Sequence, residues 1–166
     1  MKKLTQHIDL ITNILTIIVA VLLISFFVQR YFFPNQPLPR LPIIGNTIVI
    51  DNLETSQNSK NVLFVMMKGC HFCEESMEFY KKTIQQNQNK SVKFVAVFPP
   101  NSKEIENYLH SYGISGVEIK YSELSKIDVD GTPTIIVADQ NGRIVKTWSG
   151  KLSSTGEKDF LDFLNS

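Results

Sequence analysis

The residues of this sequence best suited to chemistry are its only two cysteines, Cys70 and Cys73. They lie three positions apart in the segment KGCHFC (68–73), which follows an apolar run and opens a segment with helical periodicity. A sulfur at the start of a helix faces unpaired backbone N–H groups and the positive end of the helix dipole, which lower the thiol pKa and favour the nucleophilic thiolate. The second sulfur, one turn inside the helix, is close enough to form a disulfide with the first. The spacing therefore predicts thiol–disulfide exchange.

Two other uses of the cysteine pair fit its residue types less well. A structural disulfide across so short a loop contributes little through chain entropy. A metal site made from Cys70, His71, Cys73 and His110 would suit Cu(I), because thiolates are soft ligands, but adjacent Cys and His side chains at a helix start can hardly bind one ion together. A tethered copper-binding or copper-transfer module is therefore the alternative to an enzyme. Haem attachment is excluded, because Glu74 stands where a CxxCH motif needs histidine.

The elements around the cysteines alternate between strands and helices. Apolar runs predict buried strands, and amphipathic periodicity predicts helices between them. We expect Ser102 to cap the second helix and residues 139–142 (DQNG) to form a hairpin turn. The expected strands are 47–50, 62–67, 92–98, 134–138 and 143–148, and the expected helices are 73 to about 86, 102 to about 112, and 157–164. The order β-β-α-β-α-β-β-α predicts an α/β domain with a mixed central sheet and helices on both faces.

A second motif, distant in sequence, narrows this prediction. Residues 129–134 (VDGTPT) stand about sixty positions after the cysteines and run into an apolar strand, and the tail 150–153 (GKLS) leads into an apolar helix. Together with the CxxC pair between a strand and a helix, these features make residues 60–165 resemble the thioredoxin superfamily. In that family a Thr-Pro loop with a cis proline faces the active-site disulfide. The long apolar segment near the N-terminus and the DQNGR hairpin (139–143) resemble most closely the membrane-tethered, extracytoplasmic TlpA/ResA-type branch.

The resemblance implies roles for four residues. Cys70 would be the attacking thiol and Cys73 the resolving thiol. A cis bond before Pro133 would hold Thr132 so that its backbone pairs with an extended substrate segment. The Cys70–Cys73 disulfide would be the redox group, with no metal and no further cofactor. The partners would be thiols or disulfides of extracytoplasmic proteins, with the domain acting more as a reductant and drawing electrons from a membrane donor.

Departures from the family pattern leave the proton acceptor and the redox direction open. Phe64 stands six residues before Cys70, where many thioredoxins have a buried aspartate, and Ser76 stands where some tethered relatives have a glutamate. His71 and Phe72, which we expect to face substrate, are neither Gly-Pro nor Pro-His. A positively charged His71 beside Cys70 would stabilise the thiolate and make the disulfide more oxidising, whereas a ring that points to water would do little.

The first 33 residues predict a membrane anchor. The twenty positions from Leu10 to Gln29 carry no charged side chain, and a helix of that length spans roughly 30 Å, the thickness of a bilayer's hydrocarbon core. The apolar stretch is long for a cleaved signal peptide and no small-x-small site follows it, so we expect an uncleaved anchor. Lys2 and Lys3 favour a cytoplasmic N-terminus, which places the following domain outside the cytoplasm.

Between the anchor and the domain we expect a spacer. Four prolines within residues 34–42 exclude a helix or a central strand and predict an extended, semi-rigid linker, so that the domain covers residues 43–166. The whole chain has 17 basic and 16 acidic residues. Because nucleic-acid binding needs a clustered basic surface, this balance argues against a nucleic-acid partner.

Overall fold

The computed structural model describes residues 2–32, 41–50, 53, 60–87 and 91–166, and the chain forms two compact units, 1–38 and 39–166. In the first unit, helix α1 (Lys2–Phe32) contains the span Ile11–Val28, which is long and apolar enough to cross a membrane. The side chains of this span are exposed, and the Thr16 hydroxyl donates a hydrogen bond to the Thr12 carbonyl at 2.8 Å, so one polar group is satisfied within the helix. Residues 34–40 of the linker predicted over 34–42 lie outside the described residues.

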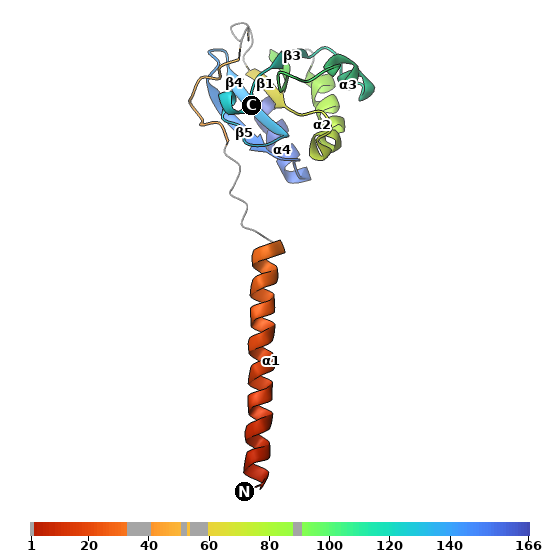
Figure 1. Ribbon diagram of the computed structural model, residues 1–166. Coiled ribbons are helices and arrows are strands. Elements are labelled where there is room, and N and C mark those ends of the chain that lie inside the picture. Colours follow the sequence, from red (N-terminus) through yellow and green to blue (C-terminus); the bar gives the residue numbers. More distant parts are fainter. Residues whose placement is uncertain (1, 33–40, 51–52, 54–59, 88–90) are drawn as a thin grey trace. The chain divides into compact units, whose positions relative to one another are not determined.

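The second unit is built on a five-stranded mixed sheet in the order β3-β2-β1-β4-β5 (Figure 1). Strand β1 is central; it pairs in parallel with β2 and antiparallel with β4, while β3 and β5 form the edges. The elements are β1 (Lys60–Val65), α2 (His71–Asn87), β2 (Val92–Phe98), α3 (Ile105–Ser111), β3 (Glu118–Tyr121), the 3-10 turn η1 (Leu124–Ile127), β4 (Thr134–Asp139), β5 (Ile144–Ser149) and α4 (Ser154–Asn165). The mixed sheet predicted from the sequence is confirmed.

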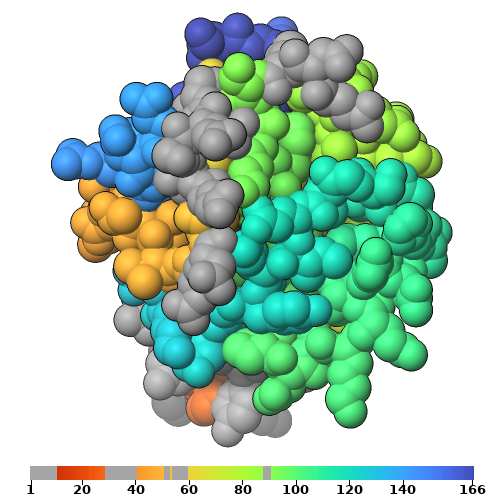
Figure 2. Space-filling view, turned by 90° about the horizontal axis from the view of Figure 1, so that it is seen from above, coloured from red at the N-terminus to blue at the C-terminus, as the bar shows by residue number. Residues whose placement is uncertain are grey.

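The two faces of the sheet are covered unequally. Helices α2, α3 and α4 pack on one face, where Phe64, Tyr80 and Phe160 are among the largest fully buried side chains. On the other face η1 and the extended segment 48–50 cover Leu63 and Val65 of β1. Figure 2 shows the segment 41–50 (orange) and the residues around 120–130 (turquoise) on one surface of this domain. In the described part of the domain, the three α-helices therefore lie on the first face, and the second face carries one helical element, the 3-10 turn η1.

The strand predicted over 47–50 is wrong. Ile48 and Ile50 are buried and Val49 is exposed, as the alternating pattern requires, but the backbone forms only an isolated bridge from Thr47 to Arg143. The Ile48 N–H donates to the Gly142 carbonyl in the β4–β5 turn at 2.9 Å, and the Ile50 carbonyl accepts from the Leu53 N–H at 3.2 Å. The segment therefore buries its apolar side chains without adding a strand to the sheet.

The region between β2 and β4 departs most from the prediction. Ser102 does not cap α3: its N–H donates to the Pro99 carbonyl at 3.0 Å, which closes a turn, and the helix begins only after Glu104, the N-cap residue, at φ 55°. Strand β3 was not predicted: its sequence EIKY alternates polar and apolar residues, but over only four positions, the shortest run that indicates a strand. It forms because it pairs with the carboxyl half of β2, where Glu118 lies opposite Val95.

Candidate active site

The topology brings the cysteine segment and the Thr-Pro loop to the same end of the sheet. Val65, the last residue of β1, pairs with Thr134, the first residue of β4, because the two central strands are antiparallel neighbours. The chain leaves β1 through a tight turn in which the Cys70 N–H donates to the Met67 carbonyl at 3.2 Å. Gly69 has φ +80°, a left-handed conformation that favours glycine. The cysteines thus lie beyond the carboxyl end of the central strand.

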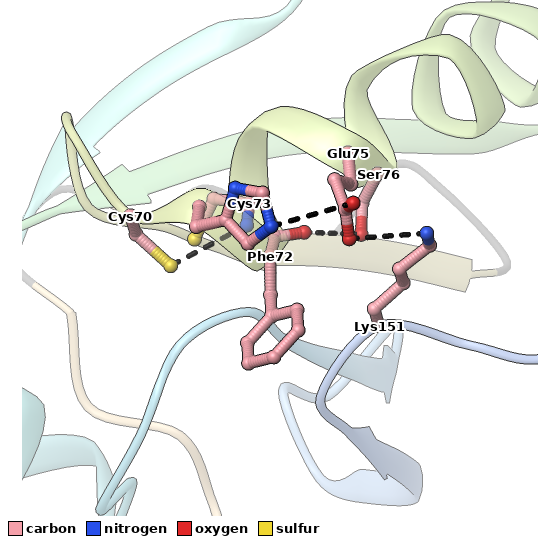
Figure 3. Close-up of polar contacts among 7 residues, drawn as sticks. Cys70, Phe72, Cys73, Glu75, Ser76 and Lys151 are labelled. Carbon is pink, nitrogen blue, oxygen red and sulfur yellow. Dashed lines mark hydrogen bonds and ion pairs between the residues drawn. The ribbon is translucent and has the colours of Figure 1, made fainter.

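Cys70 occupies the N-cap position of α2, which begins at His71 rather than at Cys73 as predicted. The Cys70 Sγ accepts a hydrogen bond from the Cys73 backbone N–H at 3.3 Å and one from the Thr132 hydroxyl at 3.4 Å (the first contact is drawn in Figure 3). Partial burial raises the pKa of the Cys70 thiol, but hydrogen bonds with Cys73, Thr132 and the Phe72 backbone outweigh it and hold the pKa below its ordinary value. These contacts stabilise the thiolate.

Cys73 has the opposite environment. It is fully buried in the first turn of α2, and burial, together with its hydrogen bond to Cys70, raises the pKa of its thiol to about 12. Both cysteines are free thiols in the structure. The reduced pair therefore combines an accessible sulfur that ionises readily with a buried sulfur that keeps its proton.

The Thr132–Pro133 peptide bond is cis, as the resemblance implied. Thr132 lies against Cys70 through its hydroxyl group and also through its carbonyl, which is 3.5 Å from the Cys70 Sγ. The Pro133 carbonyl accepts a hydrogen bond from the Gly150 N–H at 2.8 Å, and the Thr134 hydroxyl donates to the Gly131 carbonyl at 2.8 Å. The loop is thus fixed on both sides of the proline.

The two residues between the cysteines are both at the surface. Phe72 is 55% exposed and presents its ring beside the pair (Figure 3). The His71 side chain is 76% exposed, and its Nε2 lies 3.4 Å from the Glu75 carboxylate. The second oxygen of Glu75 accepts a hydrogen bond from the Lys151 Nζ at 3.1 Å (Figure 3). Sequence reasoning did not find Lys151, because 76 positions separate it from Glu75 and no motif links them.

The buried environment of Cys73 contains no carboxylate among the residues that the structure describes. Phe64 fills the position discussed above and stacks on Tyr80, with ring centroids 4.3 Å apart. The Ser76 hydroxyl donates to the Phe72 carbonyl at 2.7 Å, so its proton is committed to the helix backbone. At these two positions the structure thus places a packed aromatic ring and a hydroxyl bonded to the helix backbone, and not a carboxylate.

The metal ligand set suggested by residue type does not assemble. His110 is exposed on α3, and His71 turns toward Glu75. In the described part of the chain, no three His, Cys, Asp or Glu side chains lie together in a way that could hold a metal ion. In the described residues, neither histidine therefore joins the two cysteines as a metal ligand.

Comparison with known proteins identifies the family to which the domain is similar. Residues 52–165 match the family described as thioredoxin-like domain. The chain is 25% identical over 166 residues to the thiol-disulfide oxidoreductase ResA of Halalkalibacterium halodurans, which covers 92% of each chain.

Two solved structures share the fold. A putative protein disulfide isomerase from Bacteroides thetaiotaomicron has a TM-score of 0.64 at 14% identity and covers 78% of this chain and 92% of its own. StoA from Bacillus subtilis has a TM-score of 0.55 at 17% identity, and the match covers 79% of this chain and 99% of the StoA chain. The predicted class, a thioredoxin-like oxidoreductase, agrees with these matches and with the paired thiols. The chain belongs to the thioredoxin-like domain family.

Proposed function

We propose that this protein is a membrane-tethered thiol–disulfide oxidoreductase that exchanges its Cys70–Cys73 dithiol with disulfides of extracytoplasmic proteins, acting as a reductant. The observation that carries the proposal is the inequality of the two thiols. The Cys70 Sγ accepts hydrogen bonds from Cys73 and Thr132, and these keep its pKa low, whereas burial keeps the pKa of Cys73 high. An ionised outer sulfur and a protonated inner one are what a two-step exchange requires.

The reaction balances without another cofactor. The Cys70 thiolate attacks one sulfur of a substrate disulfide, forming a mixed disulfide and releasing the other substrate sulfur as a thiolate. Cys73 then loses its proton and attacks the Cys70 sulfur, which releases the second substrate thiolate and leaves the Cys70–Cys73 disulfide. Two electrons pass to the substrate, and the thiolates take up protons from solvent. A membrane donor of two electrons would restore the dithiol.

The surroundings of Cys70 suit an extended protein segment as substrate. The cis bond at Thr132–Pro133 holds the Thr132 backbone beside the Cys70 sulfur, where a substrate strand could pair with it. The exposed Phe72 ring offers apolar contact beside the pair. His71 faces the same side of the domain but points to Glu75.

The character of the donors around Cys70 favours the reducing direction. The hydrogen bonds to its sulfur come from a backbone N–H and a hydroxyl group, both neutral. Strong oxidants of this chemistry owe their high potential to stabilisation of the reduced, thiolate form. A thiolate held by neutral donors is stabilised less than one held by a cation, so we expect a low reduction potential.

The anchor supports the placement of this chemistry. Helix α1 can span a bilayer, and the basic residues Lys2 and Lys3 favour a cytoplasmic N-terminus. The proposed organisation is an anchor over 1–33, a linker over 34–42 and the domain over 43–166. A reporter that works only outside the cytoplasm should be active when it is fused at Ser166. Activity there of a reporter that works only in the cytoplasm would contradict the topology.

The exchange itself is tested by trapping. In Cys73→Ser the resolving sulfur is missing, so mixed disulfides between Cys70 and its partners should accumulate in membranes and disappear on treatment with a reductant. The matched control Cys70→Ser retains one thiol but, because that thiol is buried and protonated, should trap nothing. Trapping by Cys70→Ser but not by Cys73→Ser would reverse the roles, and trapping by neither variant would refute the proposal.

A further inference from the structure

A chain of three ionisable side chains borders the cysteine pair. The Glu75 carboxylate uses one oxygen to contact the His71 Nε2 at 3.4 Å and the other to accept a hydrogen bond from the Lys151 Nζ at 3.1 Å (Figure 3). His71 and Glu75 are one turn apart on α2, so their side chains lie on the same face of the helix. Lys151 comes from the segment between β5 and α4.

Lys151 is tied to the backbone that contacts the reactive sulfur. The preceding residue, Gly150, donates its N–H to the Pro133 carbonyl at 2.8 Å, and Thr132 contacts the Cys70 Sγ. The position of the lysine is therefore fixed by the same loop that forms one wall of the site. Glu75 contacts both Lys151 and the imidazole, and no hydrogen bond in the described residues joins the imidazole to the Cys70 sulfur.

The direction of His71 matters because it is the residue next to Cys70. The hydrogen bonds received by the Cys70 sulfur come from neutral groups, Cys73 N–H and the Thr132 hydroxyl. A protonated imidazole turned toward the sulfur would add a charged donor, which stabilises a thiolate far more than a neutral one does. Paired with Glu75, the same imidazolium has its charge compensated. The hydrogen bond from Lys151 lowers the pKa of Glu75, so the carboxylate stays ionised.

We propose that Glu75 is a positioning residue of the redox site: supported by Lys151, it holds His71 away from Cys70 and so keeps the cysteine pair reducing. The inference rests on the proposed function, because it concerns the potential of that same pair. By charge alone, loss of Glu75 would favour the Cys70 thiolate and loss of Lys151 would disfavour it, whatever His71 does. The effect through His71 is therefore the part of the Glu75 effect that disappears when the imidazole is removed, because Glu75 contacts His71 and Lys151 does not.

The test uses the full chain in detergent micelles at pH 7, with the dithiol–disulfide ratio trapped in graded glutathione buffers. Glu75→Gln frees the imidazole and should make the pair about threefold more oxidising, a shift of about 14 mV for a two-electron couple. The pH midpoint of Cys70 alkylation should fall with it. Lys151→Gln should leave the potential unchanged or make the pair more reducing. Glu75 still holds His71 in this variant, and the negative charge of Glu75 is no longer compensated by the lysine.

Two further variants test whether Glu75 acts on the potential through His71. In a His71→Ala background, Glu75→Gln should leave the potential unchanged, because no imidazole is there to be released. Glu78→Gln removes the same charge one turn later on α2, where Glu78 pairs with Lys81 and Lys82, and should also have no effect. Equal shifts of potential in Glu75→Gln and Lys151→Gln, a shift that survives in His71→Ala, or no shift at all would overturn the inference. A wild-type chain without any reversible couple would instead overturn the proposed function.

Discussion

At the scale of single residues, the site depends on what surrounds each sulfur. Cys70 and Cys73 are chemically identical and three positions apart, yet hydrogen bonds lower the pKa of one thiol and burial raises that of the other. The spacing in the sequence predicted the pair and a helix beside it, which starts two residues earlier than expected. It could not predict Thr132 as a hydrogen-bond donor to the sulfur, because that contact joins residues 62 positions apart.

Thr132→Val should destabilise the Cys70 thiolate and so raise the pKa of the thiol. The variant keeps the shape of the side chain but removes the hydroxyl that donates to the Cys70 Sγ. Because a hydrogen bond to a charged group contributes about 1.5 kcal/mol or more, the pKa of Cys70 should rise by about one unit. Alkylation of Cys70 by iodoacetamide at pH 7 should then slow by up to about tenfold. Thr132→Ser keeps the hydroxyl and should behave like wild type; an unchanged pH profile in Thr132→Val would show that the hydroxyl does not act on the sulfur.

The buried thiol should make the reduced protein sensitive to alkali. In the folded state the pKa of Cys73 is about 12, against an ordinary value of 9.0. The contribution of this group to stability is complete below about pH 9 and is lost as the pH rises toward 12, because the unfolded chain gives up its proton first. Urea unfolding between pH 8 and 10.5 should therefore show the wild type losing up to about 1.4 kcal/mol per pH unit more than Cys73→Ala. Parallel curves for the two proteins would contradict the burial argument.

At the scale of elements, the site exists because β1 and β4 are antiparallel neighbours. Their pairing places Val65 opposite Thr134, so the segment after β1 and the loop before β4 meet at one end of the sheet. Sequence patterns predicted both strands within two residues, because each is a continuous apolar run that a doubly covered strand requires.

Local patterns failed where long-range pairing decides the structure. Strand β3 forms from the four-residue segment EIKY because β2 offers an edge for pairing. Segment 47–50 has a strand-like pattern, but its Ile48 N–H bonds to the β4–β5 turn instead. The start of α3 was missed because the Ser102 N–H closes a turn on Pro99. The ion pair between Glu75 and Lys151 likewise needs the fold to bring the segment before α4 beside α2.

Helix α4 holds the β5 edge and α2 together through one ring. Phe160 is fully buried, and its ring lies 5.0 Å from that of Trp148 on β5 and 5.7 Å from that of Phe79 on α2. Phe160→Ala should lower the free energy of unfolding by about 3–5 kcal/mol, since large-to-small changes of this kind leave a cavity. Phe163→Ala, which removes a half-buried ring from the same helix, should cost clearly less. Equal losses in urea unfolding would mean that α4 is not anchored through Phe160.

At the scale of the whole molecule, the chain combines a helix suited to a membrane with a domain suited to thiol chemistry. The first unit supplies an apolar helix that can span a membrane, and the second supplies a thioredoxin-like domain with an unequal pair of thiols. Composition indicates a division of the chain near its N-terminus, because the apolar segment and the four prolines stand outside the alternating pattern of the domain. Under the proposed function, the anchored domain would receive electrons within the membrane and pass them to cysteines of neighbouring proteins.

The reduction potential of the full chain tests this account most directly. Thiol trapping in graded redox buffers should reveal a reversible two-electron couple involving Cys70 and Cys73, and both Cys→Ser variants should lack it. We expect a potential near about −270 mV or below, the range of a reductant. A value near about −120 mV would make the protein an oxidant and contradict the proposed direction, and the absence of any reversible couple would contradict the assignment as an oxidoreductase.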